Sequence, residues 1–397
     1  MSTRPAPDPR LPIVATVDLD AITSNVRALV AAAPTSAIMA VVKADGYGHG
    51  LLASARAAQA GGATWLGAAQ QAEALALRDA GVAGRIFTWL HVPGTDFAAA
   101  LERDVDLAAS SPWELAEIAA AARTTGIPAR LHLKVDTGLG RSGAFGADFT
   151  ELVRSARRLE DDGHVSVVGV WSHFAYADEP DHPTVRHQQV VFEDAVATAE
   201  QLGCRPEVRH LANSAATLTN PAVHYDLVRP GIAVYGLSPV PQLGGAQAYG
   251  LRPAMTLTAR LALVKRLPAG QGVSYGHAYT TPTDTVVGLV PAGYADGVPR
   301  NASNLGPVTV DGRRYTIAGR VCMDQFVLDL GPDSSAQAGA EVVLFGAGGP
   351  SAQEWAEATG TISYEIVTRI GPRVPRITVG GGALRLSSDA ATAEARR

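Results

Sequence analysis

Residues 105–136, VDLAASSPWELAEIAAAARTTGIPARLHLKVD, contain the alternation that decides the fold. A short β-rich run, VDLAAS, precedes a stretch rich in Ala, Leu and Glu with helical spacing, and a second β-rich run, ARLHLKVD, follows. Alternation of this kind predicts parallel strands joined by helices.

The same alternation extends from about Leu11 to Gly236. Other β-rich runs are IVATVDL, AIMAVVK, TWLGA, RIFTWL, VVGVWSH, VRHLAN and YDLVRPG, and further helical spacing occurs over Leu51 to Ala60 and Ala69 to Ala80. About eight such units over roughly 230 residues fit a (β/α)₈ barrel of the TIM type better than an open sheet.

The pattern changes after Pro239 to Gly250, a segment rich in Pro and Gly that we interpret as a linker. The runs that follow alternate as strands do: MTLTARLALV, GVSYG, TVVGLVPAG, PVTVDGRRYTIAG, QFVLDL and EVVLFG. Asp311-Gly312 predicts a hairpin, and one late helix is expected near Ala352 to Thr359. We therefore expect an α/β protein with a barrel domain over residues 11–240 and a mainly β domain over residues 250–385.

Composition excludes several classes of function. The 397 residues carry a formal net charge of -5 and no basic block, so nucleic acid is not an expected partner. No secretory signal and no run approaching the ~20 apolar residues of a membrane span is present, so we expect no membrane association. Cys204 and Cys322 form no spaced motif, and we interpret them as reduced thiols of a cytoplasmic protein.

Reactive residue types gather where the predicted barrel strands end. In such barrels the active site lies at the C-terminal ends of the strands. Lysine is rare in this chain, yet two of its three lysines occur at those ends. Unlike arginine, a desolvated lysine amine can lose its proton and bond covalently to a carbonyl carbon. The residues at the strand ends are Lys43, Lys134, Asp136, His173, Asn213, Ser214 and Arg229. We expect no metal site, because no cluster with metal-ligand spacing accompanies the lysines.

Nine stretches, in order along the chain, resemble the alanine racemase family. They are AVVKADGYGHG (40–50), HLKVDTGLGRSG (132–143), WSHFAYADE (171–179), HLANSAA (210–216), RPGIAVYG (229–236), GVSYGHAYT (272–280), GYADG (293–297), GRVCMDQ (319–325) and ISYEI (362–366). The resemblance implies an isomerase that binds pyridoxal phosphate and interconverts L- and D-alanine. It also implies a role in supplying D-alanine for peptidoglycan.

The resemblance assigns the catalytic roles. Lys43 would hold the cofactor covalently and then act as one acid/base. Racemisation removes a proton from one face of the α-carbon and returns it to the other, so a second base is needed. The resemblance makes Tyr275 that base, supported by His173 and then Arg229. Arg229 would also face the pyridine nitrogen, where a permanent cation makes the ring a weaker electron sink.

Further residues are assigned to the cofactor and substrate in the same way. The phosphate would be held by backbone N–H groups and hydroxyls of Gly231, Ile232, Ser214, Tyr47 and Tyr364, with Asn213 beside them. Lys134 is a candidate for carbamylation, which would let it hold Arg141; the alternative is a plain surface pair with Asp136. Arg141 would orient the substrate carboxylate, Met323 would offer it a backbone N–H, and Tyr294 would narrow the entrance.

The resemblance also implies a homodimer with shared active sites. Tyr275, Tyr294 and Met323 would then serve the cofactor of the other copy. Two other classes of function stay open: another enzyme on this fold, either a broad-specificity amino-acid racemase or a decarboxylase, and a non-catalytic pyridoxal-phosphate-binding protein. Arg229 argues against the decarboxylase, and the predicted β domain argues against the non-catalytic protein.

Overall fold

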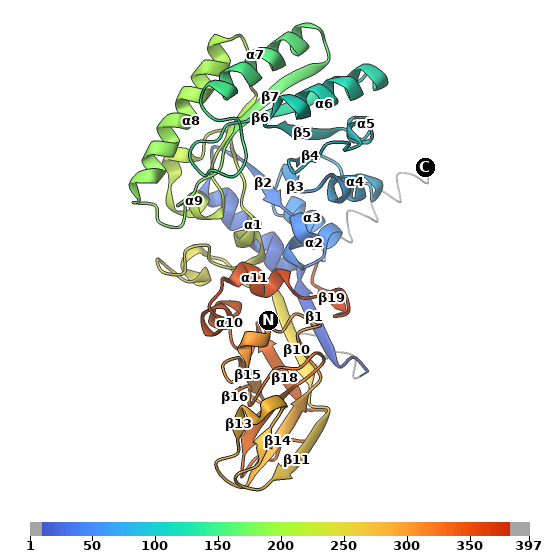
Figure 1. The fold of residues 1–397 in the computed structure, drawn as a ribbon, viewed down its shortest axis with the longest axis vertical. Coiled ribbons are helices and arrows are strands. Elements are labelled where there is room, and N and C mark those ends of the chain that lie inside the picture. Colours follow the sequence, from blue (N-terminus) through green and yellow to red (C-terminus); the bar gives the residue numbers. More distant parts are fainter. Residues whose placement is uncertain (1–9, 382–397) are drawn as a thin grey trace. The chain divides into compact units, whose positions relative to one another are not determined.

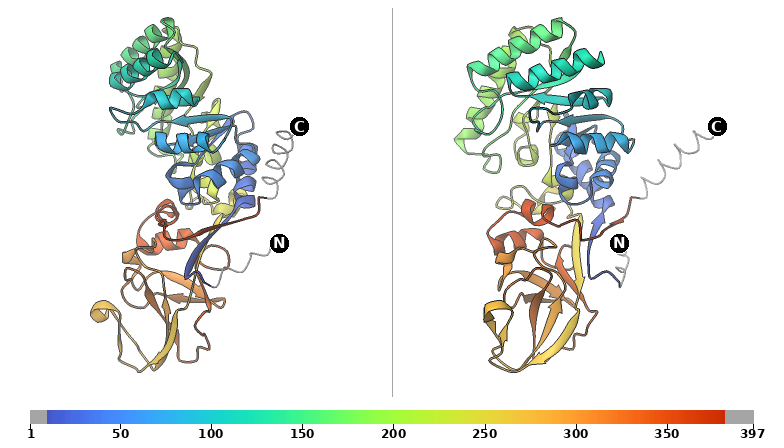
Figure 2. Two further views of the ribbon diagram at one scale, coloured as in Figure 1. Left: turned by 90° about the vertical axis from the view of Figure 1, so that its right-hand side faces the viewer. Right: turned by 45° about the vertical axis from the view of Figure 1, so that its right-hand side comes forward.

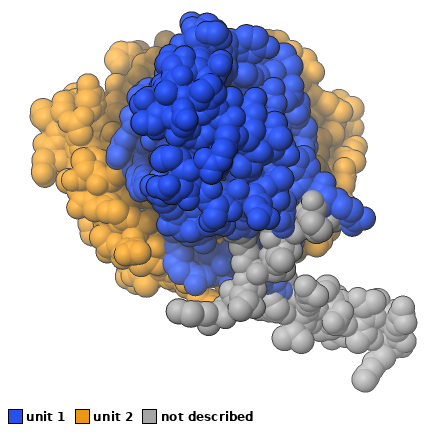
Figure 3. All heavy atoms as spheres, turned by 90° about the horizontal axis from the view of Figure 1, so that it is seen from below, with its two compact units in different colours: residues 1–21, 47–53, 252–397 blue, residues 22–46, 54–251 orange. Residues whose placement is uncertain are grey.

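The computed structural model describes residues 10–381, so the last residues of the predicted second domain, 382–385, lie outside the described part. The chain divides into two compact units, which Figure 3 colours separately. Among the described residues, unit 1 comprises 10–21, 47–53 and 252–381, and unit 2 comprises 22–46 and 54–251.

Unit 2 is built on eight parallel strands in the order β8-β7-β6-β5-β4-β3-β2-β9. Figure 1 labels β2 to β7 of this sheet. The strands are β2 (Ala37–Val41), β3 (Trp65–Ala68), β4 (Arg85–Thr88), β5 (Val105–Ala109), β6 (Ala129–Lys134), β7 (Val165–Trp171), β8 (Val208–His210) and β9 (Leu227–Val228). An isolated parallel bridge between Asn213 and Arg229 joins the chain just beyond β8 to the chain just beyond β9. The predicted (β/α)₈ barrel is confirmed.

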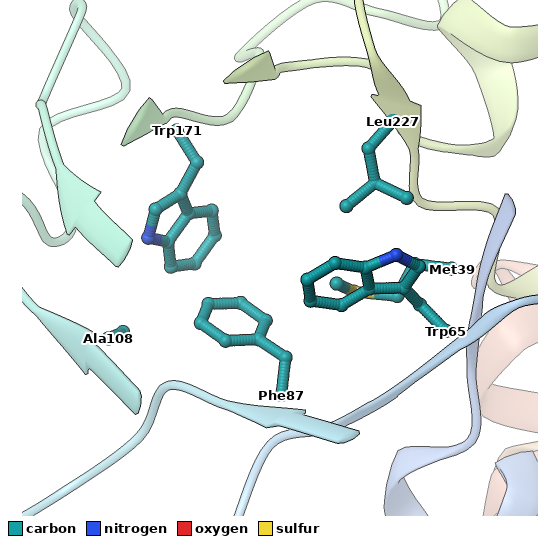
Figure 4. Close-up of a cluster of buried hydrophobic side chains, with 6 residues drawn as sticks. All are labelled: Met39, Trp65, Phe87, Ala108, Trp171 and Leu227. Carbon is teal, nitrogen blue, oxygen red and sulfur yellow. The ribbon is translucent and has the colours of Figure 1, made fainter. Parts of the chain in front are cut away.

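The barrel interior is filled by side chains from six of these strands. Met39, Trp65, Phe87, Ala108, Trp171 and Leu227 form one buried cluster and point toward one another (Figure 4). Phe87 lies at the centre, with its ring centroid 5.4 Å from that of Trp171. Burying an aromatic side chain of this size stabilises the fold by about 1.5–3 kcal/mol, so the cluster anchors the strands whose ends carry the candidate site.

Helices alternate with the strands and flank the sheet (Figure 2). They are α1 (Leu19–Ala32), α3 (Leu51–Ala60), α4 (Gln71–Asp79), α5 (Phe97–Glu102), α6 (Pro112–Thr125), α7 (Ala147–Asp161), α8 (Pro183–Gln201) and α9 (Ser214–Thr219). Residues 105–136 contain the signals that start and end such a helix. α6 begins with Pro112, and Gly126 ends it in the left-handed conformation. The predicted helices over 51–60, 69–80 and 112–125 are confirmed.

Unit 1 is mainly β. Its largest sheet has the order β16-β15-β18-β10-β1-β19, a second sheet has the order β11-β14-β17, and β12 pairs with β13. The strands are β1 (Ile13–Asp18), β10 (Met255–Arg260), β11 (Leu263–Leu267), β12 (Gly272–Val273), β13 (Tyr279–Thr280), β14 (Thr285–Val290), β15 (Pro307–Val310), β16 (Arg313–Thr316), β17 (Phe326–Gly331), β18 (Glu341–Phe345) and β19 (Arg376–Val379). Helices α10 (Ala352–Thr359) and α11 (Ser363–Thr368) complete this unit.

Two strands differ from the sequence-based expectation. We grouped IVATVDL with the barrel strands, but β1 pairs antiparallel with β10 and parallel with β19. The run MTLTARLALV is two strands in different sheets, because the chain leaves β10 at Leu261, whose N–H donates to the Ala340 carbonyl. The predicted hairpin is confirmed: Asp311 and Gly312 have φ of 48° and 76° and join β15 to β16, as a primed turn requires.

Two further observations bear on the class of protein. Neither Cys204 nor Cys322 is in a disulfide. Within residues 10–381, no helix has the length and apolar character needed to cross a lipid bilayer.

Candidate functional site

Five strand ends of unit 2 carry the side chains that the sequence analysis singled out. Lys43 is the second residue after β2, Lys134 ends β6, His173 follows β7, Ser214 follows β8, and Arg229 follows β9. Because parallel strands of a closed barrel end on one rim, these groups share the same end of the barrel. The predicted convergence of lysine, histidine and arginine on one rim is therefore present in unit 2.

The backbone after Lys43 is unusual. Ala44, Asp45 and Gly46 all lie in the left-handed helical region, with φ of 54°, 53° and 60°. A non-glycine residue in this region costs roughly 1–2 kcal/mol, so the turn is strained at two successive positions. The turn is tied down where the Gly46 N–H donates to the Val42 carbonyl at 2.8 Å. This geometry fixes the point from which the Lys43 side chain departs.

The surroundings of Lys43 favour its neutral form. Burial lowers the pKa of Lys43, and the positive charge of Arg141 lowers it further, against a smaller opposing effect of Glu73. Its Nζ lies 5.9 Å from the centre of the Trp89 ring. A lysine that loses its proton more easily is a better nucleophile toward a carbonyl carbon.

Lys134 is buried more deeply than Lys43. Burial, Arg229 and Arg141 lower its pKa to about 8. Its amine donates to the Ser142 hydroxyl and lies 4.3 Å from the centre of the Trp171 ring. The carboxylate of Asp136 instead accepts three backbone N–H groups of residues 138–140, at 2.9 to 3.2 Å. Asp136 therefore shapes the loop, and its charge only partly opposes the lowering of the Lys134 pKa.

Arg229 is buried among neutral acceptors. Its Nη2 donates to the Ser172 carbonyl at 2.8 Å and to the His173 Nδ1 at 3.2 Å, and its Nη1 donates to the His210 Nδ1 at 3.3 Å. None of the ion pairs within residues 10–381 joins Arg229 to a carboxylate. Burial lowers its pKa to about 9, which still leaves the guanidinium charged at neutral pH. Arg229 therefore places a positive charge on the rim without a carboxylate of residues 10–381 in ion-pair contact with it.

The contact with Arg229 fixes the tautomer of His173. A guanidinium can only donate, so the Nδ1 of His173 must accept, and the ring proton sits on Nε2. Burial, followed by the charge of Arg229, lowers the pKa of His173 well below its ordinary value, so the ring is neutral. His173 therefore presents an N–H donor on the side away from Arg229.

A buried chain of histidines behind Arg229 was missed by the sequence analysis. His210 accepts from Arg229, so its Nε2 donates to the His132 Nδ1 at 2.9 Å. The Nε2 of His132 is then left to donate to Asp106, at 3.4 Å. Both histidines occur in the quoted motifs, but sequence alone does not tell a strand histidine that faces the interior from one that faces a helix.

Ser214, which follows β8, is hydrogen-bonded to the segment after β9. Its hydroxyl oxygen accepts the backbone N–H of Gly231 at 2.8 Å and that of Ala233 at 3.4 Å. Accepting twice leaves the hydroxyl proton of Ser214 available to donate to an anion. Asn213 caps α9 by accepting the Ala216 N–H at 3.1 Å. The start of α9 at Ser214 is thus hydrogen-bonded to Gly231, the residue before Ile232.

Two tyrosines that the resemblance assigns to the phosphate lie next to each other in unit 1. The ring centroids of Tyr47 and Tyr364 are 6.3 Å apart. Burial, and then the neighbouring phenol of Tyr364, raise the pKa of Tyr47, so its hydroxyl stays protonated and can donate. Tyr47 belongs to unit 1 because the next residue, Gly48, packs tightly on α11: a Cβ at Gly48 would lie 2.4 Å from the Val367 carbonyl oxygen.

Tyr275, Tyr294 and Met323 are exposed in unit 1. Their exposed fractions of 72%, 42% and 53% are high for large apolar side chains. Two backbone hydrogen bonds, from Tyr294 N–H to the Cys322 carbonyl and from Ala295 N–H to the Met323 carbonyl, hold two of their loops together. The Ser274 hydroxyl donates to the Arg320 carbonyl at 2.7 Å and fastens the third loop. Unit 1 thus brings the three loops into one group.

A barrel whose rim carries two amines and an unopposed arginine, continued in the same chain by a mainly β unit, is the architecture of a two-domain barrel enzyme. The family model described as "Alanine racemase, N-terminal domain" matches residues 17–239, and "Alanine racemase, C-terminal domain" matches residues 254–378. Alanine racemase of Frankia casuarinae is 60% identical over 365 residues, covering 91% of this chain and 95% of that protein.

Another relative and a solved structure are also similar to this chain. Alanine racemase of Streptomyces coelicolor is 58% identical over 373 residues, covering 92% of this chain and 95% of that protein. The crystal structure of alanine racemase from D-cycloserine-producing Streptomyces lavendulae superposes with a TM-score of 0.93 at 57% identity, covering 94% of this chain and 98% of that one. The chain belongs to the alanine racemase family.

Proposed function

We propose that this protein interconverts L- and D-alanine with pyridoxal phosphate bound at the rim of the barrel. The observation that carries the proposal is the setting of Arg229: a buried cation held by neutral acceptors, on the rim that also holds Lys43. A permanent cation beside a pyridine nitrogen keeps that nitrogen unprotonated. A ring with an unprotonated nitrogen is a weaker electron sink. This property suits racemisation, which gains from a short-lived carbanion, better than it suits decarboxylation.

The chemistry of the donor set fits pyridoxal phosphate. Lys43, with its lowered pKa, supplies an amine able to bond to the aldehyde carbon. The Ser214 hydroxyl and the backbone N–H groups of Gly231 and Ile232 would hold the phosphate, with Asn213 positioning α9 beside them. Tyr47 and Tyr364 would add phenol donors. When bound, the cofactor supplies a conjugated ring that makes the α-proton of the amino acid easier to remove.

We propose that two bases move the α-proton. The Lys43 amine would carry a proton on one face of the α-carbon, and the Tyr275 phenol would carry it on the other. Tyrosine is a weak acid, so its deprotonated form needs support. The Nε2–H of His173 is the donor for that support, because Arg229 holds the other ring nitrogen as an acceptor.

The substrate carboxylate would be held by Arg141 and by the backbone N–H of Met323, and Tyr294 would narrow the pocket around the small side chain. We propose that Lys134 is carbamylated to hold Arg141. The neutral amine would bond to the carbon of carbon dioxide and release one proton. A pKa of about 8 favours this reaction, since more of the amine is neutral near neutral pH than in an ordinary lysine.

The assembly and setting belong to the same proposal. A homodimer would bring Tyr275, Tyr294 and Met323 of one copy to the rim of the other, and exposed aromatic side chains of this kind suit an interface. We propose a cytoplasmic enzyme that supplies D-alanine for peptidoglycan, with a barrel domain within residues 11–240 and a mainly β domain over 250–385 that β1 joins from the N-terminal segment.

The experiment is incubation of the purified protein with pyridoxal phosphate and L-alanine, followed by chiral detection of D-alanine. We expect both enantiomers at equal concentration at equilibrium. Lys43→Ala should lose both this activity and the visible absorbance of the bound cofactor. Bound cofactor without D-alanine, or release of carbon dioxide instead, would overturn the proposal. Faster racemisation of larger amino acids would favour a broad-specificity racemase.

A further inference from the structure

Gln188 is a buried side chain that the sequence analysis did not single out. It lies on α8, and its exposed fraction is 0%. Glutamine is seldom buried fully, because its amide has two N–H donors and one oxygen acceptor that must all find partners. Here both ends of the amide are bonded, and every partner comes from the barrel rim rather than from α8.

Two of the partners of Gln188 are backbone groups of His173 and Ala175. The Nε2 of Gln188 donates to the His173 carbonyl at 3.2 Å, and the Oε1 of Gln188 accepts the Ala175 N–H at 2.9 Å. The same Nε2 donates to the Thr137 hydroxyl at 3.0 Å. The side-chain amide of Gln188 therefore bonds to the backbone of His173 and Ala175 and connects it to the segment that follows β6.

These hydrogen bonds can run in one direction only. The Ser172 hydroxyl donates to the Val135 carbonyl at 2.7 Å, so it must accept from the Thr137 hydroxyl, 2.9 Å away. Thr137 has then used its proton and must accept from Gln188. The Ala175 N–H fixes which end of the amide is the oxygen. A glutamate at this position would keep the acceptor and lose both donors.

The segment held in this way carries two contacts of Arg229. The carbonyl of Ser172 accepts from the Arg229 Nη2 at 2.8 Å, and the neighbouring His173 Nδ1 accepts from the same nitrogen at 3.2 Å. We propose that Gln188 is a positioning residue for racemisation: it holds the Ser172–His173 backbone so that His173 stays on Arg229 with its Nε2–H directed outward. This inference rests on the role given to His173 under Proposed function.

The test compares Gln188→Met with a matched control on the same helix. Methionine has a similar length and no hydrogen bonds. Gln189→Met removes a buried amide that is bonded to Arg186 and Glu193 of α8 and to Tyr225, which precedes β9. In the holoenzyme, Gln188→Met should lower kcat at least about tenfold, since misplacing a catalytic group by about 1 Å can cost on the order of a hundredfold. Cofactor affinity and visible absorbance should be unchanged, and Gln189→Met should be as active as wild type.

Two further readouts separate positioning from general damage. Solvent deuterium exchange should fall more for the alanine enantiomer that Tyr275→Phe affects, and Gln188→Met combined with His173→Ala should be no slower than His173→Ala alone. A crystal structure of Gln188→Met should show the His173 Nδ1 beyond about 3.5 Å from the Arg229 Nη2, outside hydrogen-bond range. Should Gln188→Met fail to fold, Thr137→Val breaks the same chain with an isosteric side chain and should give the same asymmetry.

The two proposals fail in different ways. If His173→Ala slows racemisation but Gln188→Met leaves kcat unchanged, or slows both enantiomers equally, the role of Gln188 is wrong and the proposed function stands. If His173→Ala itself is as fast as wild type, the support of Tyr275 by His173 is wrong, and the inference about Gln188 falls with it.

Discussion

The two-base proposal can be tested most directly at Tyr275. Tyr275→Phe keeps the ring and removes the oxygen that would carry a proton. Because acid–base groups contribute roughly 10²–10⁴-fold, we expect exchange of the α-proton to fall by about that factor for one alanine enantiomer and far less for the other. Deuterium incorporation followed by NMR measures both. Equal losses for the two enantiomers would contradict the scheme.

The matched control is another tyrosine of unit 1. Tyr279 is four residues away, and its hydroxyl donates to Asp329 at 2.7 Å. Tyr279→Phe removes one phenol without touching the proposed proton path. Both exchange rates of this variant should stay close to those of the wild type.

The buried histidines make stability depend on pH. Burial lowers the pKa of His173 and of His210 well below 6.5, so the unfolded chain binds more protons than the folded chain at acidic pH. Stability is therefore complete above about pH 6.5 and is lost as the pH falls toward the lower, folded-state values. We expect the free energy of unfolding to fall from pH 7.5 to 5.5, by up to about 1.4 kcal/mol per pH unit for each histidine.

Urea denaturation at the two pH values measures this change. His210→Gln should flatten the pH dependence, because one of the two buried rings is gone. His164, in the turn after α7, is only half-buried, and His164→Gln should leave the dependence as steep as in the wild type. A free energy of unfolding that is constant over this range would contradict the prediction.

The rim residues could be predicted because each follows a recognisable strand, but their partners could not. His132 meets His210 only because β6 and β7 bring Gly169 opposite His132. A Cβ at Gly169 would lie 2.2 Å from the His132 Nδ1, so the ring fits only beside a glycine. The sequence shows the residues but not the strand register, which is why His132 and His210 were missed. Gln188 was missed because its partners Ala175 and Thr137 are 13 and 51 residues away in the sequence.

At the scale of loops and strands, Gly293 holds together the loops of Tyr294 and Met323. A Cβ there would lie 2.2 Å from the Met323 carbonyl oxygen. Gly293→Ala must therefore move one loop, and we expect a loss of about 1–3 kcal/mol in stability and roughly a tenfold rise in KM for alanine. Thermal unfolding and steady-state kinetics measure the two effects.

Gly371 provides a milder version of the same change. A Cβ at Gly371 would lie 3.4 Å from the Ala295 carbonyl oxygen, close to ordinary contact. Gly371→Ala should therefore leave KM near the wild-type value. If Gly293→Ala also left KM unchanged, these loops would not shape the substrate pocket.

The element pattern was easier to predict than the membership of each sheet. The helices of the barrel have strong helical spacing, and α6 even carries its own start and stop signals in Pro112 and Gly126. A short apolar run such as IVATV, by contrast, suits a parallel or an antiparallel neighbour equally well. Pairing of β1 with β10 depends on residues about 240 positions later, which local pattern does not contain.

At the scale of the whole molecule, the shared-site proposal predicts complementation between inactive chains. Lys43→Ala and Tyr275→Phe homodimers should both be slow. After the two are unfolded together and refolded, half of the dimers should be mixed, each with one intact site. We expect about one quarter of the wild-type activity, measured by D-alanine formation.

The control is to refold each variant separately and mix the products afterwards. Without exchange of chains, the activity should stay at the level of the two variants alone. If co-refolding also restores nothing although mixed dimers are present, Lys43 and Tyr275 act within one chain.

The position of β1 has a consequence for synthesis on the ribosome. β1 lies between β10 and β19 in its sheet. It is synthesised before both partners and must wait for residues 255–260 and 376–379 before both of its edges are paired. Meanwhile it is an unpaired apolar strand, the kind of segment that invites aggregation or a chaperone. Residues 252–381 expressed alone would lack a central strand of their own sheet, and supplying residues 10–21 as a separate peptide should improve their solubility.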